Sequence, residues 1–345
     1  MAAVTTLAFS GAGHISTVHG LAAQAAADLT ITKVASRTWE HAVERAEQMG
    51  AAPCTYADLP GGAEVVFVCT PPAQHVTDVI QALQGGAAAI VEKPLATTLD
   101  DADRLVEAAA ASGGRLGYAE NLAFAPAVVE ARRRIGDIGA IHHLDVRVQQ
   151  ERPNWGDFLT DAWGGGVLFD LGPHPVGVAL LLAAPAKPTH VTCHLAGAAD
   201  IAADEHAELT VTFDSGLSAH FVVSWREPSR ESRVWNLQAA SGTGVLRLEL
   251  VPNLSLEING EPLELPAPRP DLPSPLLEQM GYTGQLATFA SDFAAGREPE
   301  MSAAFGRDVL ELICAAYSSA GNGGRSVALP FTGHRHRTPQ QLWLD

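Results

Sequence analysis

The sequence predicts an α/β protein in which a doubly wound parallel sheet precedes an α+β part with a large, mostly antiparallel open sheet. Short buried strands alternate with helix-like runs over residues 1–120, a pattern typical of a parallel sheet with helices on both faces. Between residues 190 and 258, strands follow one another with only short turns, which favours antiparallel pairing. The chain of 345 residues is long enough for two domains, and we place them at 1–121 and 122–345.

The composition excludes several partners. The chain has 22 basic and 39 acidic residues and a formal charge of −17, so its surface repels phosphate backbones and we expect no nucleic-acid partner. No apolar run approaches the roughly 18 residues that a membrane span needs. The N-terminal stretch lacks the basic region of a signal peptide. We therefore expect a cytoplasmic protein with no membrane partner.

The four cysteines lie far apart in the sequence, and no pair has the spacing of zinc ligands. This distribution indicates a reducing compartment without a disulfide framework. We predict no metal site.

The first strand, at residues 4–9, leads into the glycine turn Gly11-Ala12-Gly13-His14-Ile15-Ser16 and a helix-like run from about residue 17 to 27. Strand, turn and helix form the context in which G-x-G-x-x-G binds a dinucleotide. The first glycine permits the tight turn, and the second lets a pyrophosphate approach the helix N-terminus. Ser16 replaces the third glycine and is small enough for packing. We predict a Rossmann domain with cofactor contacts at Gly11, Gly13, His14 and Ile15; a plain tight turn is the alternative.

The second strand, at residues 29–35, is followed by Ser36 and Arg37. An NAD site usually has an acidic residue here for the adenosine ribose, but the next acid, Glu40, lies in the following helix. An arginine beside hydroxyl groups suits a 2′-phosphate. We therefore predict NADP in preference to NAD. The alternative is that Arg37 is an ordinary loop residue that does not contact the cofactor.

An unusual charge ends the buried run at residues 87–91, which continues into Glu92, Lys93 and Pro94. Ligands of open α/β sheets bind beyond the carboxyl ends of the strands, which is where Lys93 stands. Pro94 restricts the backbone of Lys93 and indicates a lysine held in one place. The alternative is an ordinary surface lysine.

The remaining elements of the first part continue the alternation. We expect a short strand near Thr55 and Tyr56, a buried strand at residues 63–69 closed by Thr70 and Pro71, and a helix opened by His75.

Several motifs together resemble the Gfo/Idh/MocA family of oxidoreductases, named after glucose–fructose oxidoreductase, inositol dehydrogenase and a rhizopine-catabolism protein. The resemblance covers nearly the whole chain. Its strongest parts are E-K-P at residues 92–94 and G-G-G-x-x-x-D-x-G-x-H at residues 164–174. The other matching stretches are the glycine turn, Thr70-Pro71-Pro72 with His75, Gly117-Tyr118-Ala119-Glu120-Asn121 with Pro126, Ile138-Gly139, and Ala315-Ala316-Tyr317-Ser318-Ser319.

The resemblance implies an NAD(P)-dependent dehydrogenase or reductase acting on a secondary alcohol or ketone of a sugar, cyclitol or related polyol. It implies Lys93, Asp170 and His174 as the catalytic set and makes the Lys93–Pro94 bond a candidate for the cis form. It also implies that the last helices return to the first domain and that a homodimer or homotetramer forms through the open sheet. The further cofactor contacts predicted are Thr70, Pro71, His75, Glu92, Lys93, Glu120 and Asn121.

The chemistry of alcohol oxidation supports this catalytic set. A base must take the hydroxyl proton, and a lysine beside a positively charged nicotinamide ring holds its own proton less firmly. An imidazole titrates close to neutral pH, so His174 is the other candidate, and the choice between them stays open. Asp170 precedes His174 by four residues, so it could hold the substrate or only cap the helix predicted at residues 176–182.

The substrate itself is not assigned, because the chain departs from the family at Gly177, where many members have an aspartate, and at Ala123, where many have an arginine. Two other functions stay open, namely a nicotinamide-dependent glycosidase or lyase acting by transient oxidation and a non-catalytic dinucleotide-binding scaffold. The predicted substrate contacts, each with a structural role as its alternative, are Asn121, Trp155, Asp157, Trp163 and Tyr282 in addition to the catalytic set.

Overall fold

The computed structural model describes residues 4–344. Within it the chain forms two compact units, each built from separate stretches. The first unit contains the chain up to Ala96, Asp100–Ala125 and Pro268–Arg307. The second unit contains Thr97–Leu99, Pro126–Ala267 and the chain from Asp308 onward. Among residues 4–344, no helix combines the length and the apolar character that crossing a membrane requires.

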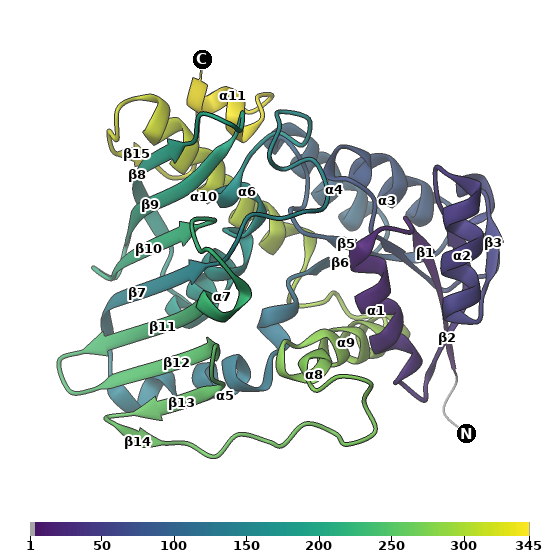
Figure 1. The fold of residues 1–345 in the computed structure, drawn as a ribbon, viewed down its shortest axis with the longest axis horizontal. Helices are drawn as coiled ribbons and strands as arrows, with labels where there is room; N and C mark the ends of the chain where they lie inside the picture. Colours follow the sequence, from purple (N-terminus) through teal and green to yellow (C-terminus); the bar gives the residue numbers. More distant parts are fainter. Residues whose placement is uncertain (1–3, 345) are drawn as a thin grey trace. The chain divides into compact units, whose positions relative to one another are not determined.

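The first unit holds a six-stranded parallel sheet in the order β3-β2-β1-β4-β5-β6, drawn in purple and blue in Figure 1. Consecutive strands run outward from β1 in one direction and from β4 in the other, which confirms the doubly wound sheet. Ligands of such sheets bind where the order reverses, here between β1 and β4. The strands are β1 (Thr5–Ser10), β2 (Leu29–Ala35), β3 (Ala52–Cys54), β4 (Val65–Val68), β5 (Ala88–Glu92) and β6 (Leu116–Ala119).

Two boundaries differ from the sequence prediction. The short strand expected near Thr55 and Tyr56 lies earlier, as β3 at Ala52–Cys54. It ends at Cys54 because its partner β2 ends at Ala35, opposite Cys54. Tyr56 instead begins a 3-10 turn. The first helix begins at His14 rather than near residue 17, since Gly13 already serves as its N-cap.

Helices complete the first unit. α9 packs against α1, and its amphipathic register buries Leu286 and Phe289. The short helix α8 was not predicted, because one helical turn leaves no periodic pattern. The helices are α1 (His14–Gln24), α2 (Trp39–Met49), α3 (His75–Gln84), α4 (Leu99–Ala111), α8 (Leu276–Gln279) and α9 (Tyr282–Ala294).

The second unit holds a nine-stranded sheet in the order β14-β13-β12-β11-β7-β10-β9-β8-β15, drawn as a ladder of arrows in Figure 1. Its pairs are antiparallel, as predicted, apart from β7 and β10, which are parallel. The strands are β7 (Ile141–Gln149), β8 (Pro188–Gly197), β9 (Asp204–Phe213), β10 (Ser218–Ser224), β11 (Val234–Ser241), β12 (Val245–Val251), β13 (Ser255–Ile258), β14 (Glu261–Pro262) and β15 (Val327–Ala328).

Only one face of this sheet is covered by helices of the same unit. Along β7, Leu144, Val146 and Val148 are buried, whereas Asp145 and Arg147 on the other face are not. The buried face receives α7, which contacts β7, and α6, which contacts β9 and β10. The helices are α5 (Pro126–Arg134), α6 (Val167–Asp170), α7 (Pro173–Ala183), α10 (Ala303–Gly321, shared with the first unit) and α11 (Pro339–Leu344).

Candidate functional site

The glycine turn after β1 has the geometry that a dinucleotide needs. Gly11 has φ +105°, and a Cβ there would lie 2.7 Å from the carbonyl carbon of Cys69, so glycine is required. Gly13 caps α1 without any side-chain hydrogen bond, and a Cβ on it would meet nothing within 4 Å. The first N–H groups of α1 thus receive no side-chain cap, and the first turn of α1 carries no acidic residue. These residues fit a pyrophosphate.

Ser16 takes the place of the third glycine of the motif and is fully buried. Its Oγ donates to the carbonyl oxygen of Gly13 at 2.7 Å. The substitution therefore keeps the close packing and also fastens the turn. His14 and Ile15, which the sequence placed in the glycine turn as cofactor contacts, lie in the first turn of α1.

His75 ties two strand ends together. Its side chain is buried, with Nε2 2.9 Å from the carbonyl oxygen of Thr70 and Nδ1 3.0 Å from that of Pro94. Burial lowers the pKa of His75, while the facing carbonyl oxygens oppose that effect. The imidazole thus fixes the turn after β4 against the turn that carries Lys93, and the peptide bond Lys93–Pro94 is cis, as predicted.

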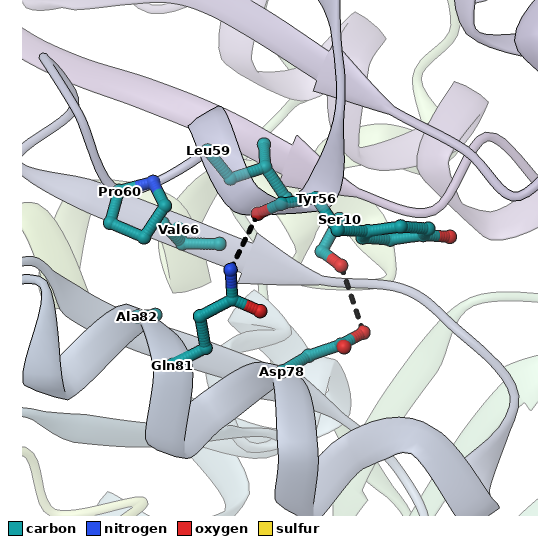
Figure 2. A pocket seen from close by; sticks show the side chains of 8 residues that line it. All are labelled: Ser10, Tyr56, Leu59, Pro60, Val66, Asp78, Gln81 and Ala82. Carbon is teal, nitrogen blue, oxygen red and sulfur yellow. Dashed lines mark hydrogen bonds between the residues drawn. The ribbon is translucent and has the colours of Figure 1, made fainter.

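A carboxylate lies between the ends of β1 and β4. Asp78, in the first turn of α3, accepts hydrogen bonds at Oδ2 from Ser10 Oγ (2.9 Å) and Thr70 Oγ1 (2.8 Å). Figure 2 shows Asp78 directed at Ser10, with Tyr56 beyond it. The hollow beside them measures about 10 Å³, room for about one water molecule. This cluster fixes α3 to the sheet and holds no larger ligand.

Glu92 and Lys93 stand at the end of β5, and a histidine that the sequence analysis missed holds the glutamate. His19 of α1 is fully buried, and its Nε2 lies 2.5 Å from Glu92 Oε1. The other carboxylate oxygen accepts from the backbone N–H of Lys93 at 3.0 Å. The His19 ring packs on Phe67 at 4.1 Å and on Tyr282 at 5.3 Å. Because Glu92 joins α1 to the Lys93 backbone, it fixes the position from which the lysine side chain departs.

Glu120 and Asn121 follow β6 and are both buried. Glu120 Oε1 accepts from the backbone N–H of Leu122, and Asn121 Nδ2 donates to the carbonyl oxygen of Met280 at 2.7 Å. Tyr282 begins α9 two residues after Met280. Burial raises the pKa of Tyr282, and the negative charges of Glu92 and Glu120 raise it further. The first unit therefore places Glu92, Glu120 and Tyr282 in one neighbourhood at the carboxyl edge of its sheet.

The end of β2 carries no acidic residue, as the sequence indicated. Ser36 is partly buried and Arg37 is exposed. Arg45 of α2, which the sequence analysis missed, extends toward the glycine turn. Its Nη2 lies 3.4 Å from the carbonyl oxygen of Ala12 and 3.5 Å from that of Gly13. Arg37 thus follows the end of β2, and the guanidinium group of Arg45 lies beside the glycine turn.

In the second unit, Asp170 and His174 lie on a nearly continuous helical run. Asp170 ends α6, Gly172 is the N-cap of α7, and His174 N donates to the carbonyl oxygen of Leu171 at 3.2 Å. A Cβ on Gly172 would lie 2.1 Å from the carbonyl oxygen of Leu168, so this joint requires glycine. The idea that Asp170 caps the next helix is wrong, because no side chain caps α7.

The helix predicted at residues 176–182 begins three residues earlier, at Pro173. Proline suits the first position of a helix, where its missing N–H is not needed, and this places His174 within the first turn. Residues 164–173 and 175–179 are buried, whereas His174 is partly exposed. His174 is therefore more accessible to solvent than its neighbours in this segment.

Trp155, Asp157 and Trp163 belong to an aromatic loop of the second unit. Its centre is Phe158, which is buried and lies 5.7 Å from the ring of Trp155 and 4.5 Å from that of Trp163. A Cβ on Gly156 would lie 2.5 Å from the Trp163 indole. Packing thus accounts for Trp163, while Trp155 and Asp157 are exposed.

Two family models match the chain. Residues 6–120 match the Gfo/Idh/MocA oxidoreductase model described as an NAD-binding Rossmann fold. Residues 128–250 match the C-terminal domain model of the same family. Among solved structures, GenD2 from gentamicin A biosynthesis, crystallised in complex with NAD, superposes with a TM-score of 0.84 over 95% of this chain and 97% of that chain at 24% identity.

Two curated relatives at about 31% identity align over shorter stretches. The D-glucoside 3-dehydrogenase of Escherichia coli (strain K12) is 31% identical over 122 residues, or 34% of this chain and 35% of that protein. The dTDP-3,4-didehydro-2,6-dideoxy-alpha-D-glucose 3-reductase of Actinomadura kijaniata is 31% identical over 159 residues, or 43% of this chain and 47% of that protein. These alignments span less than half the length of either relative.

Proposed function

Because the chain belongs to the Gfo/Idh/MocA family of oxidoreductases, we propose that it transfers a hydride between a nicotinamide dinucleotide and a secondary alcohol or ketone of a sugar, cyclitol or related polyol. One observation carries this proposal. Lys93 lies at the same carboxyl edge of the sheet as the glycine turn, and the His19–Glu92 pair holds its backbone. An amine fixed at this edge suits proton transfer to or from a substrate oxygen.

The first unit provides the groups that hold the cofactor. The backbone N–H groups at the start of α1 bind the pyrophosphate, and Gly11 and Gly13 let it approach. Thr70, Pro71 and the turn held by His75 form the neighbouring wall. When bound, the nicotinamide supplies the hydride acceptor or donor.

The catalytic roles fall on three side chains. Oxidation of the alcohol removes a hydride from carbon and a proton from the hydroxyl oxygen, so a base must accept the proton. We assign this proton to Lys93 or His174. We assign substrate binding and orientation to Asp170. Because His174 is partly exposed between buried neighbours, its ring can meet a substrate oxygen without rearrangement of α7.

The cofactor that we propose is NADP. Ser36 and Arg37 follow β2, and Arg45 lies beside the carbonyl oxygens of the glycine turn. Arginine and hydroxyl groups suit a phosphate, whereas an acidic residue would suit a free ribose hydroxyl.

The substrate class is supported by the relatives. Two of them act on the 3-position of a sugar according to their names. Glucosides and nucleotide-linked hexoses therefore come first among the substrates to be tested, followed by cyclitols.

The test is a turnover assay with NADP⁺ and NAD⁺ on a panel of sugars and cyclitols, followed by nicotinamide absorbance. Lys93→Met keeps the aliphatic stem and removes the amine, so we expect kcat to fall by about 10²- to 10⁴-fold while NADPH still binds. Lys187→Met, at an exposed lysine before β8, is the matched control and should leave kcat unchanged. Undiminished turnover in Lys93→Met would refute the role of Lys93.

A second outcome would replace the function itself. If a glycoside releases free sugar with no net change in nicotinamide absorbance, the reaction is hydrolysis or elimination through transient oxidation. If NADPH binds but no member of the panel turns over with either cofactor, the hydride-transfer proposal fails for these substrates.

A further inference from the structure

Asp204, the first residue of β9, is a fully buried carboxylate with three donors around it. Its Oδ1 accepts from the backbone N–H of Gly166 at 3.0 Å and from the hydroxyl of Tyr317 at 2.6 Å. Its Oδ2 accepts from the backbone N–H of Leu168 at 3.0 Å. The phenol oxygen of Tyr317 also accepts from Gly166 N at 3.1 Å. All four residues belong to the second unit.

These donors are the beginning of α6. Gly166 is the N-cap of that helix, and Leu168 lies in its first turn. A helix start leaves backbone N–H groups without partners, and here a carboxylate from a distant strand satisfies them. The approach requires glycine, because a Cβ on Gly166 would lie 2.1 Å from the carbonyl oxygen of Asp204.

The same short helix carries Asp170. α6 has four residues, and the Asp170 N–H donates to the carbonyl oxygen of Gly166 at 2.9 Å. Leu171 and Gly172 then lead into α7, where His174 occupies the first turn. A displacement of the Gly166 backbone therefore displaces Asp170 directly and His174 through one further turn.

Stability alone is a poor reason for a buried carboxylate at this place. Burial raises the pKa of Asp204, and the hydrogen bonds from Tyr317, Leu168 and Gly166 oppose that effect. A buried charge is costly to desolvate, and apolar replacements are often no less stable. The carboxylate instead sets the orientation of the start of α6, because its two oxygens hold the N–H groups of Gly166 and Leu168 at the same time.

We propose that Asp204 and Tyr317 are positioning residues that set the orientation of Asp170 and His174 through the start of α6. The inference rests on the proposed function, in which Asp170 and His174 meet the substrate. It gives a role to Tyr317, which the sequence showed only as part of the stretch at residues 315–319. The two residues need not touch substrate or cofactor to act.

The test uses the full-length protein with Tyr317→Phe, which removes one hydroxyl, and Asp204→Asn, which sets an amide against an N–H of α6. We expect kcat to fall by about tenfold to a hundredfold, as when a catalytic group is misplaced. The affinity for NADPH, measured by fluorescence titration, should stay constant because the first unit is untouched. Ser319→Ala is the matched control: Ser319 is equally buried on α10, but its hydroxyl bonds Cys193 N and the carbonyl oxygen of Arg325.

Combined variants separate positioning from general stability. If Asp204 acts through Asp170 and His174, the loss caused by Asp204→Asn should nearly vanish in a background that carries both Asp170→Asn and His174→Asn. If the losses of kcat from the separate substitutions instead multiply in the combined variant, the inference is overturned. It is also overturned if Ser319→Ala lowers kcat equally. If Asp204→Asn does not fold, the same comparison is made with Tyr317→Phe.

The same experiment separates failure of the proposed function from failure of the positioning inference. If His174→Asn alone leaves kcat unchanged, the assignment of His174 to the catalytic set fails, and with it the role of His174 in the positioning inference. If His174→Asn lowers kcat but Tyr317→Phe and Asp204→Asn do not, only the positioning role fails.

Discussion

The side chains that follow β2 determine how the protein would distinguish two cofactors that differ by one phosphate. Arg37 is exposed there, with Ser36 beside it and no acidic residue before Glu40. A guanidinium can make two charge-assisted hydrogen bonds to a phosphate. It gains little from a ribose hydroxyl, which has no charge to complement it. We therefore expect any discrimination between the two cofactors at this position to depend on Arg37 rather than on the shape of the fold.

We predict that Arg37→Ala weakens NADPH binding by about tenfold to a hundredfold, the worth of a hydrogen bond between charged groups, and leaves NADH binding nearly unchanged. Fluorescence titration of both cofactors measures the two affinities. Arg104→Ala, at an exposed arginine of α4, is the control and should change neither. Equal weakening of both cofactors, or of neither, would remove Arg37 from the discrimination.

Other residues at this edge show what a single sequence can and cannot predict. Lys93 could be found because a lysine and a proline at the end of a buried strand are visible locally. His19 could not, since its partner Glu92 lies 73 positions away. A histidine on the buried side of a helix looks like any other core residue. The same holds for Asp204, whose donors come from α6 and from Tyr317.

Among the elements, β9 shows how ion pairs support the sheet of the second unit. Glu205 follows Asp204 and accepts from Arg152 Nη2 at 2.5 Å and from Arg226 Nε at 3.1 Å. The hydrogen bond from Arg152 holds the pKa of Glu205 below its ordinary value of 4.5, burial opposes this, and Arg226 adds to it. A carboxyl group whose pKa is lowered by folding stabilises the folded state at pH values above its pKa in the unfolded chain. This contribution is lost as the pH falls through the lowered pKa.

We predict that Glu205→Gln lowers the free energy of unfolding by about 1–3 kcal/mol near neutral pH. The difference from the unaltered protein should shrink as the pH falls below the unfolded value of 4.5 and through the lowered pKa. Urea unfolding at a series of pH values measures it. Glu208→Gln, on the same strand but exposed and paired with His220, should cost little at any pH. A pH-independent difference would contradict the assignment.

Elements with a strong period could be placed from the sequence, and short ones could not. β2 begins and ends where the pattern of residues indicated, at residues 29–35. The one-turn helix α8 and the terminal α11 were missed because four to six residues carry no recognisable repeat. The parallel pairing of β7 with β10 was not predicted either, since short turns inform only about neighbours in sequence.

The open face of the nine-stranded sheet is the surface through which we expect copies of the protein to assemble. A hollow of about 490 Å³ crosses β7, β11, β12 and β13 on this face. It is lined by charges of both signs, including Asp145, Arg147, Arg247 and Glu257. A surface with both signs can complement a second copy of itself across a two-fold axis.

We predict that the protein forms a homodimer or homotetramer through this face. Light scattering after size-exclusion chromatography should give a mass of two or four chains, and Arg147→Glu combined with Arg247→Glu should shift it toward one chain. Arg133→Glu, at an exposed arginine of α5, is the control. A single-chain mass for the unaltered protein at micromolar concentration would contradict the prediction.

The discontinuity of the first unit has a consequence for how the protein is made. Its last stretch, Pro268–Arg307, leaves the ribosome after Pro126–Ala267, which is most of the second unit. That stretch carries α9, which packs on α1, and Tyr282, whose ring meets the ring of His19 edge to face beside Glu92. At a synthesis rate of about 5–20 residues per second, the interval between the synthesis of α1 and that of α9 is on the order of tens of seconds. During that interval α1 can pack on β2 and α2, but the side of α1 that contacts α9 still lacks that partner.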